Sequence, residues 1–285
     1  MKPYLEESNR FRIIKYRCTD IYLELSEIET AFMILSKNHD QIFTIIELLI
    51  SEEGYKTEKN GIQIIHDTYF DTKDEILKNH ESALRIREID KQDSIITLKI
   101  LKNTTENYSE RIEIEDTYSK EMLNQIIAKI NSQLNLNIVN TSLKYNSTDP
   151  KLNLINLGFK IIQNRRTQRK IVNATRKNSA QTEYEFVFDT TTYIFDNHNS
   201  SITSIELEIE LKFSKNITVL DNFVRKLKKN PSLKFWPYNK LLTGKAIEIL
   251  LNNHDLKENK DYDDRKILTL SGLEKIEIYI KSRNI

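Results

Sequence analysis

A chain of 285 residues with 39% hydrophobic and 30% charged residues has room for one large or two ordinary domains, and its composition excludes a mainly disordered protein. Its 43 Lys and Arg residues balance 42 Asp and Glu residues, so no global field favours nucleic acid or an acidic membrane. The single cysteine, Cys18, excludes an intramolecular disulfide framework. The N-terminus has no signal-peptide core, and no apolar run reaches the ~18 residues of a membrane span, so we expect a cytoplasmic protein without membrane contact.

Apolar residues spaced near i, i+3 and i+4 predict helices over residues 40–53, 119–131, 218–229 and 239–251. The polar stretch 132–150 is interpreted as a loop between two halves of the chain. Near the C-terminus, residues 271–281 begin with a capping box at Ser271 and Glu274 yet alternate like a strand, and the pattern leaves both structures open.

The remaining patterned segments alternate between charged and aliphatic residues, which predicts strands over residues 27–34, 83–87, 95–100, 111–115 and 204–212. In the last strand Glu206, Glu208 and Glu210 share one face, where carboxylates ~7 Å apart repel by about 2.4 kcal/mol at an effective dielectric of 20. An open antiparallel sheet with one wet face would tolerate this repulsion. A closed barrel with charges inside and helices outside would need cations, and the many predicted helices favour the barrel.

The block T-Y-F-D-T-K-D-E-I-L-K-N-H-E-S-A-L-R-I-R-E, residues 68–88, resembles the Y-F-D-T and A-L-R-I-R segment of the CYTH family, the triphosphate tunnel metalloenzymes. Further landmarks of that family follow in its order: Glu27-x-Glu29, Thr97-Leu98-Lys99, Arg111-x-Glu113-x-Glu115, the basic segment 163–166, Glu206-x-Glu208-x-Glu210-x-Lys212 and Lys240-x-x-x-Gly244. Two positions depart from the pattern, since Ala31 and Thr243 stand where the family has a lysine and an arginine. These departures put the ordinary activity or substrate in doubt.

The resemblance implies an α+β fold, in which a closed antiparallel eight-stranded β tunnel has a charged interior and helices packed outside. The tunnel domain is expected over residues 1–253, with halves at about 20–131 and 151–253, followed by a C-terminal extension over 254–285. The family binds triphosphate together with a divalent metal, so Mg²⁺ or Mn²⁺ is the expected cofactor. Both ions prefer oxygen ligands, which facing E-x-E strands supply.

The same resemblance implies roles for individual residues. Metal ligands are expected at Glu27, Glu29, Glu206, Glu208, Glu210 and Asp189; substrate-binding residues at Arg85, Arg87, Lys99, Arg111, Arg166 and Lys240; and catalytic residues at Glu113, Glu115 and Lys212. For Asp189 the sequence favours a second interpretation, a turn residue that ends its strand. Trp236 stacks on a ring of the substrate or, as the sequence favours, packs in the core before the 239–251 helix.

Three functions stay open. The first is metal-dependent hydrolysis of a triphosphate, either inorganic tripolyphosphate or the triphosphate tail of a nucleotide or other small organic molecule. The second is a class IV-type nucleotidyl cyclase or a polyphosphate-forming enzyme, and the third is a module that binds nucleotide or polyphosphate without turnover. The expected partner is a triphosphate-bearing small molecule or polyphosphate, nucleic acid is not an expected partner, and assembly into a homodimer stays open.

Overall fold

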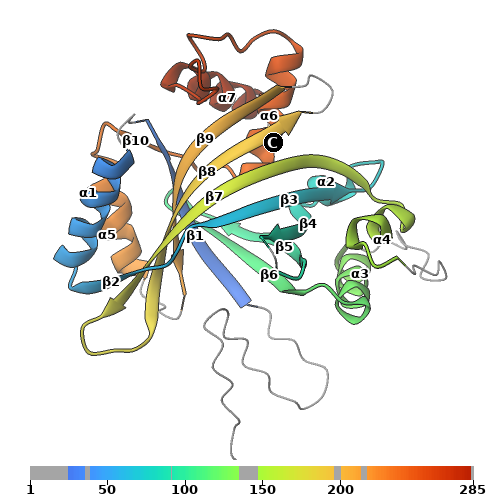
Figure 1. Ribbon diagram of the computed structural model, residues 1–285, viewed down its shortest axis with the longest axis horizontal. Coiled ribbons are helices and arrows are strands. Elements are labelled where there is room, and N and C mark those ends of the chain that lie inside the picture. The colour runs from blue at the N-terminus through green and yellow to red at the C-terminus, as the bar shows by residue number, and fades with distance from the viewer. Residues whose placement is uncertain are drawn as a thin grey trace, which may run out of the picture.

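The computed structural model describes residues 25–35, 39–90, 92–134, 147–195, 200–212 and 217–283. Eight strands in this part of the chain form one closed antiparallel barrel in the spatial order β1-β6-β5-β4-β3-β7-β8-β9, and β9 pairs back with β1 (Figure 1). They are β1 (Leu25–Ile34), β3 (Gln63–Asp71), β4 (Ser82–Ile89), β5 (Ile95–Thr104), β6 (Ser109–Thr117), β7 (Lys160–Arg176), β8 (Thr182–Phe195) and β9 (Ser200–Leu211). Two further short strands pair with strands of the barrel: β2 (Tyr55–Lys59) pairs with β7, and β10 (Leu233–Phe235) pairs with β1. The predicted closed barrel is confirmed, and the open sheet is wrong.

Alternation along each strand separates the two faces of the barrel. In β4, Leu84 and Ile86 are fully buried in an outer apolar core, whereas Arg85 and Arg87 bond to residues of neighbouring strands inside the ring. Because side chains alternate with period two, the charged parity of β4 faces the enclosed interior and its aliphatic parity faces outward.

Three groups of helices cover the aliphatic outer face (Figure 1). Helices α1 (His39–Glu52) and α5 (Ile217–Leu227) bury Ile46 and Phe223 against β8 and β9. Helices α2 (Ile76–Asn79), α3 (Lys120–Leu134) and α4 (Pro150–Asn156) cover β4 and β5, while α6 (Lys240–Asn252) and α7 (Leu270–Ser282) form a third layer around Trp236. None of the described helices is both long enough and apolar enough to cross a bilayer.

The predicted helices are confirmed to within about three residues at their ends. Of the predicted loop over 132–150, the first three residues belong to α3, which continues to Leu134, and the last begins α4 at Pro150; residues 135–146 lie outside the described ranges. The ambiguous segment 271–281 is helical, but its cap is Thr269, whose hydroxyl accepts a hydrogen bond from the Gly272 amide, rather than Ser271.

The C-terminal helix α7 packs against α6 and shares a hydrophobic core with it. Leu273, Ile276 and Ile280 of α7 share one core with Trp236 and Ile247. The helix that α7 contacts in this core, α6, begins at Lys240.

Candidate active site

Three arginine side chains, two from β4 and one from β7, surround Asp67 of β3 on one side of the barrel interior. Arg87 donates to both Asp67 carboxylate oxygens at 2.8 and 3.0 Å, and Arg165 of β7 donates to Oδ2 at 3.4 Å. The Arg85 Nε lies 3.7 Å from Asp67 Oδ1. Burial alone would raise the pKa of Asp67, but Arg87 and Arg85 outweigh burial and hold this pKa well below its usual range. We call Asp67, Arg85, Arg87 and Arg165 the basic cluster.

Arg85 links the basic cluster to β5 and β6. Its Nη2 donates to Glu115 at 3.0 Å and to the Thr97 hydroxyl at 3.1 Å, and Thr97 itself donates to Glu115 at 2.6 Å. Further along the same pair of strands, Lys99 lies 3.2 Å from Glu113 and bonds to Glu27 of β1. Arg85 Nη2 also lies 4.0 Å from Glu113, so Arg85, Lys99, Glu113 and Glu115 form one continuous network.

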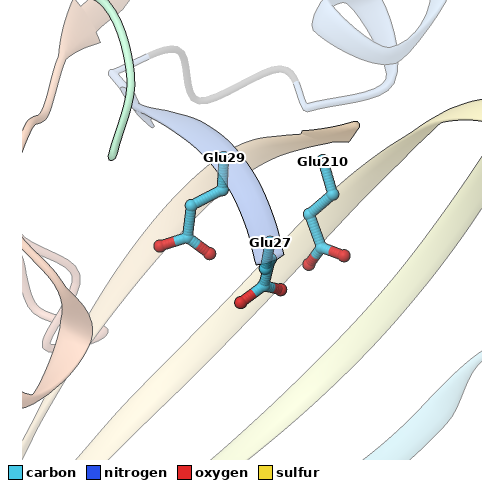
Figure 2. Close-up of side chains that lie close together, drawn as sticks. All are labelled: Glu27, Glu29 and Glu210. Atoms are coloured by element: carbon cyan, nitrogen blue, oxygen red, sulfur yellow. The ribbon is translucent and has the colours of Figure 1, made fainter. Parts of the chain in front are cut away.

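An acidic cluster lies where β1 pairs with β9. The register places Glu29 opposite Glu210, and one carboxylate oxygen from each of Glu27, Glu29 and Glu210 lies within 4.8 Å of the others (Figure 2). Unit charges 4.8 Å apart repel by about 3.5 kcal/mol at an effective dielectric of 20. Each of these carboxylates is paired with one basic group: Arg111 pairs with Glu29, Lys99 pairs with Glu27, and the partly exposed Lys212 pairs with Glu210.

A third group centres on Lys240, which enters the interior from the start of α6. Its Nζ lies 3.2 Å from Asp189 and 3.3 Å from Glu206, and it also bonds to Glu208. Arg169 of β7 donates to both Asp189 oxygens at 2.9 and 2.6 Å and lies 3.6 Å from Glu208. We call these five residues the Lys240 cluster.

The environment gives neighbouring carboxyl groups different proton affinities. Burial raises the pKa of Glu206 to about 7 although Lys240 lies beside it. Burial also acts on Glu208, but there Lys240 and Arg169 outweigh it and lower the pKa to about 2. Burial likewise raises the pKa of Glu113 to about 7 despite the adjacent Lys99. Near neutral pH, Glu113 and Glu206 are thus able to take up or release a proton.

The structure divides the predicted metal ligands into two sets. Glu27, Glu29 and Glu210 form the acidic cluster, whereas Glu206, Glu208 and Asp189 bind Lys240 and Arg169. The turn interpretation of Asp189 is wrong, because this residue is fully buried within β8 and lies opposite Arg169 and Glu206.

The placement predicted for Arg166 is also wrong. Arg166 is exposed on the outer face of β7, and the interior arginines of this strand are Arg165 and Arg169. The sequence contained a signal for this register, since Val172 and Ala174 have the parity of Arg166 and are buried in the outer core. Asp67 was missed as well, because it stands singly beside the aromatic Y-F-D-T segment and repeats no charged pattern.

Both positions that depart from the family pattern lie in the described part of the chain. Thr243 is fully buried, and its hydroxyl accepts a 2.9 Å hydrogen bond from the Trp236 indole, so Trp236 packs in the core and the expectation of a core role is confirmed. Ala31 lies opposite Glu208 in the β1–β9 pairing, and Lys240 bonds to Glu208.

A closed β-barrel whose enclosed face carries paired acidic and basic clusters defines a tunnel-type fold. The family model of the CYTH domain matches residues 25–242, and the chain belongs to this family. No curated protein sequence matches the chain significantly.

Several solved structures are similar to this chain at low sequence identity. HpAC1 from Hippeastrum, described as having a dominant triphosphatase activity, is 18% identical over 78% of this chain and 96% of its own, with a TM-score of 0.46. A protein from Pyrococcus horikoshii OT3 is 15% identical over 80% and 99%, with a TM-score of 0.43. The RNA triphosphatase Pct1 of S. pombe is 11% identical over 81% and 84%, with a TM-score of 0.31.

Proposed function

We propose that this protein hydrolyses a triphosphate with the help of Mg²⁺ or Mn²⁺, and that the substrate is inorganic tripolyphosphate or the triphosphate tail of a small organic molecule. The observation that carries the proposal is a basic cluster on β3, β4 and β7 together with an acidic cluster on β1 and β9 of one closed ring of strands. Such a site binds the polyanion through one side and a cation through the other.

The acidic cluster fits a hard divalent cation. Glu27, Glu29 and Glu210 supply only carboxylate oxygens, which are the ligands that Mg²⁺ and Mn²⁺ prefer, and small side-chain rotations bring oxygens within 4.8 Å of one another onto a common ion. Glu206, Glu208 and Asp189 would hold a second ion once Lys240 and Arg169 engage phosphate instead. A bound divalent cation acts as a Lewis acid on phosphoryl oxygen.

The protein's own side chains supply positioning and charge. Arg85, Arg87, Lys99, Arg111, Arg169 and Lys240 bind the phosphate oxygens, and arginine does so through two parallel N–H bonds. Glu113, whose pKa is raised to about 7, accepts the proton of the attacking water, and Glu115 fixes Arg85. Lys212 positions Glu210, and Arg166, on the outer face, has no role in the reaction.

An assay panel tests the proposal. Purified protein is incubated with tripolyphosphate, ATP, GTP or thiamine triphosphate, with and without each metal, and phosphate release that requires metal is the expected result. Cyclic nucleotide with pyrophosphate, or elongated polyphosphate, would support the second function instead. Saturable binding without any product would support the binding module, which the replacements at Ala31 and Thr243 keep open.

Glu27→Gln removes one charge of the acidic cluster and is expected to lower kcat/KM at least about a hundredfold, comparable to the loss of one electrostatic contact in other active sites. Glu58→Gln is the matched control, because Glu58 is exposed on β2. Equal activity of the two variants would contradict the assigned role of Glu27.

A further inference from the structure

A cavity of about 290 Å³ lies between the start of α1, the turn that joins β2 to β3, and β7. Its lining includes the apolar residues Phe43, Ile62 and Ile171. The turn is tied to β7 by the Asn60 amide, which donates to the Ile171 carbonyl at 3.0 Å. Cavities that bind small molecules begin at about 300 Å³, so this cavity suits a small ligand.

The apolar part of this lining stays in contact with water. Ile62 is 55% exposed. Phe43 is only partly buried, and its ring packs on one side against Phe188, with ring centres 4.8 Å apart. An apolar ligand in the cavity would remove both side chains from water, which favours binding.

Two ammonium groups belong to the same cavity. Lys59 Nζ lies 4.9 Å from the centre of the Phe43 ring and 2.9 Å from Glu47. Lys170 is exposed and forms no ion pair with any residue that the structure describes. The lining also includes Asp40, but Asp40 lies in the first turn of α1, where the helix N-terminus compensates negative charge. The charge left without compensation is that of Lys170, so the cavity complements an anion.

The cavity is separate from the clusters of the barrel interior. Lys170 follows Arg169 on β7, and Phe188 precedes Asp189 on β8, so neighbouring positions of the same two strands serve the cavity and the Lys240 cluster. None of the residues assigned to the proposed hydrolysis lines the cavity. The exposed, unpaired Lys170 therefore has no place in that reaction.

We propose that this cavity is a second ligand site, which binds a small aromatic anion of the aryl carboxylate or aryl sulfonate class. The ring of the ligand packs against Phe43 and Ile62, and its acid group meets the ammonium groups of Lys59 and Lys170. The inference does not depend on the proposed hydrolysis, because the two sites share no residue.

Heteronuclear NMR of the full chain tests the site, with naphthalene-2-sulfonate as the probe. Gly61 lines the cavity and is one of only 5 glycines, and its amide signal is assigned through its loss in Gly61→Ala. The expected result is a saturable shift of the Gly61 amide signal with a Kd of about 1 mM or lower, the affinity of a ligand of this size at ordinary ligand efficiency. The neutral analogue naphthalene-2-methanol should bind at least about threefold more weakly.

Two variants test the assigned contacts. Lys170→Gln removes one ammonium group and should raise the Kd of the sulfonate about three- to fivefold, the effect of an exposed ion pair. Phe43→Leu keeps an apolar side chain but loses the ring and should raise this Kd about two- to tenfold. Lys160→Gln is the matched control, because Lys160 is an exposed lysine at the start of β7 outside the cavity lining, and its Kd should equal that of the unchanged chain.

Equal Kd values for Lys170→Gln and Lys160→Gln would overturn the inference. A Gly61 signal that does not shift, or that shifts without saturation, would overturn it as well. Equal affinity for the sulfonate and the neutral alcohol would also contradict it, because charge would then play no part. Both lysine variants change exposed side chains, so this comparison stays decisive even if Phe43→Leu folds poorly.

Discussion

Within the described part of the chain, Asp67 is the carboxylate that all three guanidinium groups of the basic cluster share, so its removal leaves Arg87 and Arg165 without their buried ion-pair partner. Asp67→Asn is expected to lower the free energy of unfolding by about 3 to 5 kcal/mol, as the loss of one partner from a buried ion pair does. Urea denaturation measures the change. The control Asp93→Asn, at an exposed position, should change the free energy of unfolding by no more than about 0.5 kcal/mol.

The pH dependence of unfolding should identify Asp67 as the source of this difference. Its pKa is held below the value of about 3.9 that an unfolded chain has, so the unfolded state binds more protons in acid. The stability that Asp67 contributes is complete above pH ~4 and is lost as the pH falls further. The difference in the free energy of unfolding between the unchanged chain and Asp67→Asn should decrease below pH 4. A difference that stays constant down to pH 2 would contradict this assignment.

The pair of Trp236 and Thr243 allows a second test on single residues. Thr243→Val keeps the shape of the side chain but leaves the buried indole N–H without an acceptor, which is expected to cost about 1 to 3 kcal/mol. Trp236 is the only tryptophan, so its fluorescence reports both the unfolding transition and the local change. Thr57→Val, on exposed β2, is the control; equal stability of both variants would mean that the hydrogen bond contributes nothing.

At the scale of single elements, the sequence predicted the two faces of a strand well where charged residues occupied one set of alternate positions and aliphatic residues the other. Over residues 205–211 of β9, glutamate and aliphatic residues alternate without exception, and the prediction of its inner face is confirmed. In β7, arginines stand on both parities, and only the distant Val172 and Ala174 reveal which parity faces outward. The arginine assignment failed there because charge alone does not fix a register.

The packing of α7 depends on close approach at Gly272. A Cβ placed on Gly272 would lie 2.1 Å from the backbone oxygen of Asp261, and backbone cannot move aside as a flexible side chain can. Gly272→Ala is therefore expected to lower stability by about 1 to 3 kcal/mol through overpacking, although alanine is the better helix former. Gly61→Ala meets no atom within 4 Å and should be nearly neutral in thermal unfolding. A neutral Gly272→Ala would show that α7 docks loosely.

At the scale of the whole molecule, alternation and helix content predicted a charged interior, but they could not predict how its charges pair. The contacts of Lys240 join a helix start to β8 and β9, and those of Arg165 join β7 to β3. Such contacts depend on strand register and on barrel closure, which are properties of the assembled ring rather than of any segment. The division of the predicted metal ligands into two sets therefore became visible only in three dimensions.

The separation of charge across the interior predicts that metal and polyanion stabilise the protein cooperatively. A cation relieves the carboxylate repulsion of the acidic cluster, an anion relieves the guanidinium excess of the basic cluster, and each bound ion attracts the other. A ligand at one hundred times its Kd stabilises the folded chain by about 2.7 kcal/mol. Scanning calorimetry should show that Mg²⁺ and tripolyphosphate together raise the melting temperature by more than the sum of their separate shifts.

Glu29→Gln removes one carboxylate of the acidic cluster. In this variant the rise in melting temperature with Mg²⁺ and tripolyphosphate together should be close to the sum of the two separate rises. In Glu58→Gln, which is exposed on β2, the rise with both ligands should still exceed that sum. Because the coupling is reciprocal, Glu29→Gln should also weaken the binding of tripolyphosphate in Mg²⁺ more than in EDTA. Purely additive shifts in the unchanged chain would mean that the two clusters bind their ions independently. The metal ion and the tripolyphosphate would then not share one site in the barrel interior. The proposed hydrolysis needs the metal ion next to the bound triphosphate, so such a result would contradict it.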